Sequence, residues 1–143
     1  MVKREMYMKR IRPFIGTDLI KVMTGIRRSG KSVMLELIKQ ELIDSGVSSS
    51  QFISINFEDL EYEGLQNYHA LHEYIVERLI PETPVYVFLD EIQHVPQFEK
   101  VVGSLFIKPN VDIYITGSNA YFMSSDMATL LTGRYVQIEM LPL

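Results

Sequence analysis

Residues 25 to 32 read Gly-Ile-Arg-Arg-Ser-Gly-Lys-Ser, which is a complete G-x-x-x-x-G-K-[ST] pattern. The glycines at its two ends let the backbone turn successive N–H groups toward one anion. The lysine brings a positive charge to the β- and γ-phosphates of a nucleotide, and the final serine hydroxyl is suited to ligate Mg²⁺. The pattern therefore predicts a nucleotide-binding loop made of Gly25, Ile26, Arg27, Arg28, Ser29, Gly30, Lys31 and Ser32.

The residues on either side of this loop have the periodicity that the loop requires. Residues 19–24, Leu-Ile-Lys-Val-Met-Thr, are mainly apolar and predict a strand. From Met34 to Leu42, apolar residues recur at helical spacing, which predicts a helix over about 31–44 that ends before Gly46. The free N–H groups and dipole at the start of such a helix also favour a phosphate. This context separates the pattern from a chance match in a surface loop.

The composition is that of a globular protein with one core. The chain has 143 residues, of which 47% are hydrophobic and 22% charged. Its net charge of −4 argues against non-specific binding of nucleic acid by the whole surface, although it does not exclude a local basic patch. Basic residues cluster between positions 3 and 12, and a solvated helix face is the preferred interpretation of this cluster. No apolar run is long enough to span a membrane, and there is no cysteine. We therefore expect a cytoplasmic protein without a membrane segment.

Strands and helices alternate along the chain. Besides the two elements around the loop, we expect strands at 52–57, 85–89, 111–116 and 135–140, and helices at 4–15, 68–80 and about 98–105. The connection at 58–67 is acidic. This alternation predicts an α/β protein with a parallel sheet of about five strands and helices on both faces, a three-layer α-β-α arrangement.

A second chemical signal follows the third predicted strand. The apolar run 85–89 leads directly into Asp90 and Glu91. Ligands of an open parallel sheet lie beyond the carboxyl ends of its strands, so Asp90 is expected near the loop, where it can hold Mg²⁺ together with Ser32. Glu91 can orient and deprotonate an attacking water. A strand that ends in two solvated acids is the alternative, and the complementary chemistry of the loop favours catalysis.

Five blocks of the sequence occur in the order and spacing of a known family: 24–32, 55–59, 88–93, 115–118 and 131–135. Through them the chain resembles a prokaryotic family of AAA-type P-loop ATPases, with the loop as its Walker A motif and Asp90 and Glu91 as its Walker B pair. The resemblance implies ATP and Mg²⁺ as cofactors and Mg²⁺-dependent ATP hydrolysis. Members of this family usually continue into a C-terminal nuclease-like domain. We therefore expect residues 1–143 to be the ATPase domain without its helical lid and second domain.

The family resemblance also implies a strand order of 5-1-4-3-2, which places residues 116–119 between the two phosphate motifs. Ser118 or Asn119 is then similar to the family's sensor of the γ-phosphate, with ordinary turn chemistry as the alternative. Asn56, at the end of the second strand, could hold Glu91 away from water, or could simply form a turn.

Arg134 stands at a position similar to the arginine finger of AAA+ proteins. In that role it would act on the nucleotide of a neighbouring chain in a homo-oligomer. A structural salt bridge is the alternative.

Other residue types give weaker signals. His69, His72 and His94 lack the spacing of a zinc site, and we expect them at the surface. Tyr7 and Phe14 could line an adenine pocket, although core packing is the simpler interpretation.

Two other functions compete with ATP hydrolysis. One is a nucleotide-dependent switch that does not hydrolyse. The other is a small-molecule P-loop kinase, which is disfavoured because residues 120–132 contain no Arg or Lys for a lid.

Overall fold

The computed structural model describes residues 2–25, 30–118 and 133–141. Within these ranges, five parallel strands form one sheet: β1 (Ile20–Gly25), β2 (Phe52–Asn56), β3 (Val85–Asp90), β4 (Val111–Gly117) and β5 (Tyr135–Met140). Their order is β2-β3-β4-β1-β5, which is the predicted order 5-1-4-3-2 counted from the other edge. The predicted α/β fold is therefore confirmed, with β4 inserted between the strand before the loop and the strand that ends in Asp90.

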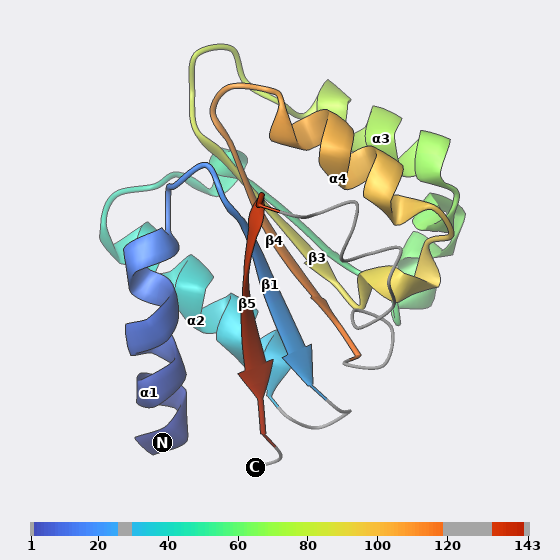
Figure 1. Ribbon diagram of the computed structural model, residues 1–143. Coiled ribbons are helices and arrows are strands. Elements are labelled where there is room, and N and C mark those ends of the chain that lie inside the picture. Colours follow the sequence, from blue (N-terminus) through green and yellow to red (C-terminus); the bar gives the residue numbers. More distant parts are fainter. Residues whose placement is uncertain (1, 26–29, 119–132, 142–143) are drawn as a thin grey trace.

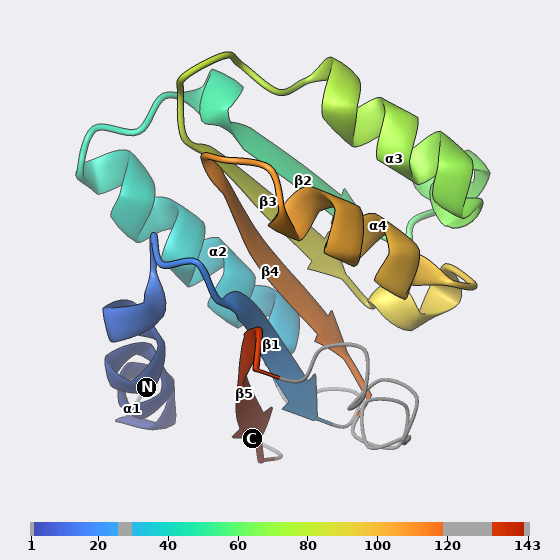
Figure 2. The same cartoon turned by 45° about the horizontal axis from the view of Figure 1, so that its top comes forward.

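Two layers of helices cover the sheet (Figure 1 and Figure 2). Helices α1 (Val2–Ile11) and α2 (Lys31–Asp44) lie on one face, and α3 (Tyr68–Glu77) and α4 (Phe98–Phe106) lie on the other. The predicted leading helix ends at Ile11 and continues as a short 3₁₀ helix that contains Pro13. The acidic connection is more ordered than expected, since it contains the 3₁₀ helix Leu60–Gln66. None of the described helices is long and apolar enough to cross a membrane.

Each face of the sheet has its own apolar core. The α2 stripe expected from the sequence is buried against the strands, and so is α1. Tyr7 of α1 is 1% exposed, and its hydroxyl accepts a hydrogen bond of 2.9 Å from the Leu141 N–H after β5. Tyr7 therefore serves packing, in line with the simpler of its two interpretations.

A buried ion pair lies at the amino ends of β1 and β4. The Lys21 ammonium is 0% exposed; it contacts the Asp112 carboxylate and donates to the Thr17 carbonyl at 2.9 Å. The same carboxylate accepts from the Gly16 N–H at 2.9 Å and from the Tyr114 hydroxyl at 2.6 Å. Burial and the neighbouring carboxylate raise the pKa of Tyr114, so its hydroxyl stays protonated and donates.

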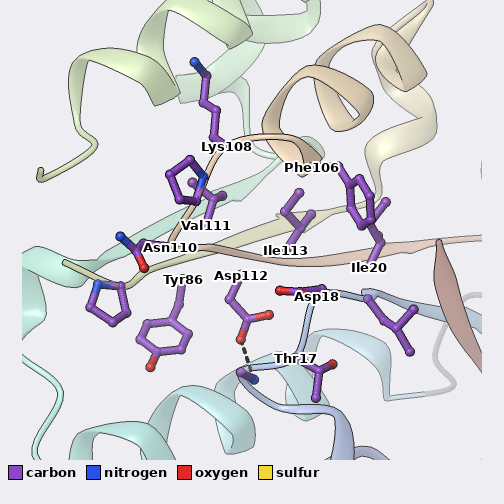
Figure 3. A pocket seen from close by; sticks show the side chains of 14 residues that line it. Thr17, Asp18, Ile20, Tyr86, Phe106, Lys108, Asn110, Val111, Asp112 and Ile113 are labelled. Atoms are coloured by element: carbon purple, nitrogen blue, oxygen red, sulfur yellow. Dashed lines mark hydrogen bonds between the residues drawn. The ribbon is translucent and has the colours of Figure 1, made fainter. Parts of the chain in front are cut away.

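A cavity of about 230 Å³ borders this ion pair (Figure 3). Asp112 lies on its wall together with Tyr86 and Phe106, and Asp18 and Lys108 also line it. Its position at the amino end of the sheet places it away from the predicted nucleotide loop.

Candidate functional site

The predicted nucleotide loop stands in the sequence between β1 and α2, and these two elements meet it at the carboxyl end of β1 and the amino end of α2. Gly30 precedes the helix with a φ of 92°, a left-handed conformation that costs a residue with a Cβ about 1–2 kcal/mol. The glycine thus lets the chain turn directly from the loop into α2. Lys31 and Ser32 consequently occupy the first turn of α2, where backbone N–H groups are free to bind an anion.

The Lys31 side chain is directed back over the sheet. Its ammonium donates to the Gly25 carbonyl at 2.6 Å and lies 3.3 Å from Glu91 Oε2. It also approaches the Gly117 carbonyl at 3.4 Å, and the residue is only 5% exposed. All of these partners are oxygens, which are the same kind of partner that phosphate oxygens would provide.

Asp90 is the centre of the predicted metal site. The Ser32 hydroxyl donates to one carboxylate oxygen at 2.5 Å, and the Thr116 hydroxyl donates to the other at 2.5 Å. Strands β3 and β4 pair with Leu89 beside Ile115, and this register brings Thr116 next to Asp90. The structure therefore places Ser32 and Asp90 together, as the sequence analysis expects of two ligands for one cation.

Glu91 lies in the turn after β3. Its backbone is left-handed, with a φ of 58°, and its N–H donates to the Thr116 hydroxyl at 2.9 Å. Its carboxylate accepts from the Gln93 amide at 2.7 Å through Oε1, while Oε2 faces Lys31. The side chain that is expected to activate water is thus buried beside Lys31, the lysine that is expected to bind phosphate.

Sequence reasoning missed two members of this cluster. Thr116 connects Asp90 to the backbone of Glu91, and Gln93 holds the Glu91 carboxylate. A polar residue at the end of the mainly apolar segment 111–115 is a signal that could have identified Thr116. The role of Gln93 depends on the 3₁₀ turn Ile92–His94, which has no comparable sequence pattern.

Several predicted site residues lie elsewhere or outside the described ranges. Residues 26–29 and Asn119 are outside the described residues. Ser118 is half-buried directly after β4. The Asn56 side chain accepts from the Glu58 N–H at 3.0 Å, so it forms a turn and does not hold Glu91.

Arg134 is at the amino end of β5, because its carbonyl accepts a 2.8 Å hydrogen bond from Ile20. Its side chain is exposed, and the guanidinium carbon lies 5.6 Å from the centre of the Phe106 ring. β1 separates this position from Gly25 by about 16 Å, since a strand rises about 3.3 Å per residue. Arg134 is therefore remote from the Lys31 of its own chain.

The histidines contribute no metal site. Among the described residues, no group of three or more potential His, Cys, Asp or Glu ligands converges. His69 and His94 are exposed, as predicted. His72 is half-buried, and its Nε2 forms a 2.8 Å hydrogen bond with the Ser104 hydroxyl between α3 and α4. The surface interpretation therefore holds only in part for His72.

The donor set fits a magnesium nucleotide. Mg²⁺ prefers oxygen ligands, usually one or two carboxylates together with water and phosphate oxygens. Ser32 and Asp90 supply a hydroxyl and a carboxylate, and a cavity of about 210 Å³ lies beside them, with Ser54 and Asn56 on its wall. Lys31, at the start of α2, adds a cation for the phosphates.

A family model described as "AAA domain" matches residues 17–143. The chain belongs to the AAA domain family. This membership confirms the resemblance found in the sequence and supports a nucleotide-binding, ATPase-like domain. The AAA domain match covers every motif used above, from the strand before the loop to the residues around Arg134.

Relatives of this AAA domain occur in bacteria and archaea. An uncharacterized protein of Haemophilus influenzae is 41% identical over the whole chain, and one of Methanocaldococcus jannaschii is 38% identical over 87% of it. The chain spans only 36% and 26% of the lengths of these two relatives.

Among solved structures, a chain of Drosophila ORC bound to AT-rich DNA and Cdc6 superposes with a TM-score of 0.63. The match covers 97% of this chain and 55% of the ORC chain, at 14% identity. At that identity the similarity shows the fold alone.

Proposed function

We propose that this AAA domain binds ATP together with Mg²⁺ and hydrolyses it to ADP and phosphate. The observation that carries the proposal is the cluster at the carboxyl ends of β1 and β3. In it two adjacent residues at the start of α2 meet two adjacent acids at the end of β3: the Ser32 hydroxyl lies 2.5 Å from Asp90, and the Lys31 ammonium lies 3.3 Å from Glu91. Each group has the chemistry that one part of the reaction requires.

The loop amides and Lys31 hold the phosphates, and Ser32 and Asp90 are the residues that would hold Mg²⁺. Mg²⁺ bound there would neutralise charge on the phosphate oxygens. Glu91 accepts a proton from the attacking water as the new O–P bond forms at the γ-phosphorus. The bond between that phosphorus and the bridging oxygen breaks, and the electron pair stays with ADP.

Two substitutions test this assignment. Lys31→Ala removes the main cation for the phosphates, so ATP affinity should fall by about two orders of magnitude or more in a calorimetric titration. Glu91→Gln keeps size and hydrogen bonding but removes the base, so ATP should still bind while phosphate release falls about 100-fold or more. Unchanged affinity in the first variant would refute the nucleotide site.

Phosphate release distinguishes hydrolysis from its two alternatives. A chain that binds ATP but releases no phosphate, with or without Glu91, would be a nucleotide-dependent switch. A chain that releases phosphate only when an acceptor molecule is added would be a kinase. The relatives are about three times as long as this chain, so we further propose that hydrolysis is coupled to a C-terminal domain or a partner.

Arg134 is proposed to act on the nucleotide of a neighbouring chain in a homo-oligomer. Its position at the amino end of β5 supports action between chains, because its own Lys31 is about one strand length away. Activity per chain should then rise with protein concentration, and Arg134→Ala should keep ATP binding but lose that rise.

Mixing variants provides a sharper test of action between chains. Each of the variants Arg134→Ala and Glu91→Gln should have little activity alone. An Arg134→Ala chain, however, keeps its own Glu91 and can accept Arg134 from a partner. The mixture should therefore regain part of the activity. Arg78→Ala is the matched control. The guanidinium carbon of this exposed arginine lies 3.4 Å from the centre of the Tyr74 ring, and the residue is assigned no catalytic role. A rate independent of concentration, with no rescue, would assign Arg134 to a structural contact.

A further inference from the structure

Gln93 lies in the 3₁₀ turn Ile92–His94 and has no part in the function proposed above. Its amide nitrogen donates to Glu91 Oε1 at 2.7 Å, a short distance for an N–H donor to a carboxylate. The other carboxylate oxygen, Oε2, lies 3.3 Å from the Lys31 ammonium. The two oxygens of the expected base therefore have different partners, and only one of those partners is a residue that binds phosphate.

These two partners respond differently to a nucleotide. Lys31 has its role on the β- and γ-phosphates, so phosphate oxygens compete with Glu91 for its ammonium. Gln93 has no such competitor, and its hydrogen bond can persist when Lys31 binds phosphate. Oε1 would then remain fixed by Gln93, and Oε2 would remain directed to the place where Lys31 meets the phosphates.

The Gln93 amide is oriented so that its nitrogen donates to Glu91, and this orientation leaves the carbonyl oxygen of the same amide without a donor among the described residues. This oxygen, Gln93 Oε1, is buried. Reversing the amide would place that oxygen against the Glu91 carboxylate, so only the observed orientation can donate. A buried acceptor without a donor lowers stability and points to a role other than stability.

The neighbouring backbone shows a second local strain. Glu91 adopts a left-handed φ of 58°, which is uncommon for a residue other than glycine. Strained backbone and unsatisfied polar groups concentrate at functional sites, where the surrounding structure holds them in place. Both features occur here within three residues: the backbone angle at Glu91 itself, and the unsatisfied carbonyl on the side chain that donates to the Glu91 carboxylate.

We propose that Gln93 is a positioning residue that orients the Glu91 carboxylate for hydrolysis. The inference rests on the proposed function, because it requires Glu91 to be the base. Gln93 corresponds to the third group of a catalytic triad, which fixes the group that moves the proton without touching the substrate itself. Asn56, for which a contact with Glu91 was one of two interpretations, instead forms a turn by accepting from the Glu58 N–H.

Gln93→Met tests this role, because methionine has a similar length but no donor. The turnover number should fall about 10- to 100-fold, while the affinity for ATP stays within about twofold. The melting temperature should be unchanged or slightly higher, since the unsatisfied carbonyl is also removed. Gln93→Glu should reduce turnover at least as much, because it places a second carboxylate against Glu91 at nearly the same size.

Gln51→Met is the matched control. The Gln51 amide donates to the Pro84 carbonyl at 3.0 Å and accepts from the Ser48 N–H at 2.9 Å, away from the nucleotide loop. Losing these bonds should lower the melting temperature and leave turnover unchanged. Gln93→Met should thus lower turnover without lowering the melting temperature, whereas Gln51→Met should lower the melting temperature without lowering turnover.

The outcomes distinguish this inference from the function on which it rests. Normal turnover of Gln93→Met, while Glu91→Gln loses hydrolysis, would overturn the positioning role alone. A fall in both melting temperature and ATP affinity in the two Gln93 variants would assign the residue to structure and also overturn the role. Equal hydrolysis by Glu91→Gln and the unsubstituted chain would instead refute the base, and the proposed function with it.

Discussion

The two ends of the sheet each contain a buried lysine beside a carboxylate, but they differ in how completely the polar groups are satisfied. At the amino end, Asp112 receives Lys21, the Gly16 N–H and the Tyr114 hydroxyl. At the carboxyl end, Lys31 has main-chain carbonyls and a Glu91 oxygen 3.3 Å away. A buried Gln93 carbonyl there has no donor among the described residues.

This contrast separates a structural ion pair from a binding site. The amino-end network joins the segment before β1 to β4, and every group in it has a partner within the chain. The carboxyl-end cluster consists of donors and acceptors whose partners a phosphate or a cation can replace. Charge and burial alone do not distinguish the two lysines, whereas the identity of their partners does.

The largest expected effect concerns the amino-end pair. Lys21→Met leaves the Asp112 carboxylate buried without its cation, so the free energy of unfolding should fall by about 3–5 kcal/mol. ATP affinity of the remaining folded protein should be unchanged. Lys31→Met should show the reverse pattern, with loss of ATP affinity and little loss of stability. Urea unfolding measures the stability of both variants, and calorimetric titration measures their ATP affinity. Equal losses of stability in the two variants would contradict the distinction between a structural lysine and a binding lysine.

A smaller effect is expected when the metal ligand loses its charge. Asp90→Asn keeps the size of the side chain and its ability to accept from Ser32, but it weakens the attraction for a cation. The gain in ATP affinity on adding Mg²⁺ should therefore drop about tenfold, which corresponds to about 1.4 kcal/mol. Titrations with Mg²⁺ and with a chelator determine this gain. An Asn variant that keeps the full gain would place the metal elsewhere.

An effect of about the same size, on stability instead of affinity, is expected at one hydroxyl of the amino-end network. Tyr114→Phe removes a single donor to Asp112 while Lys21 and Gly16 remain, so unfolding should become easier by about 1–2 kcal/mol. Turnover should stay unchanged, because the network is remote from Lys31. Thermal unfolding and phosphate release measure the two quantities, and a clear loss of turnover would show that the two ends of the sheet are coupled.

The sequence predicts those parts of the site whose chemistry lies in consecutive residues. The loop 25–32 and the pair Asp90 and Glu91 can be found because each has its own pattern, and strand and helix periodicity gives the layers. Contacts across strands leave no such pattern. Thr116 meets Asp90 through the register of β3 and β4, and Gln93 reaches Glu91 through a local turn.

The amino-end network shows the same limit. Lys21 and Asp112 each stand inside an otherwise apolar segment, which could have suggested a buried pair. Neither segment alone reveals the partner, because the pairing depends on β1 lying beside β4. The strand order came from the family resemblance, since alternation of strands and helices does not determine the order.

The position of β1 also has a consequence for the order in which the chain can fold. β1 lies between β4 and β5, so it cannot pair with either neighbour until residues 111–117 have been synthesised. Tyr7 must wait still longer for Leu141, 134 positions away. Contacts between such distant parts of a chain form slowly. Until then β1 and the apolar side of α1 are exposed to solvent, and this is the stage at which a chaperone would have most to protect.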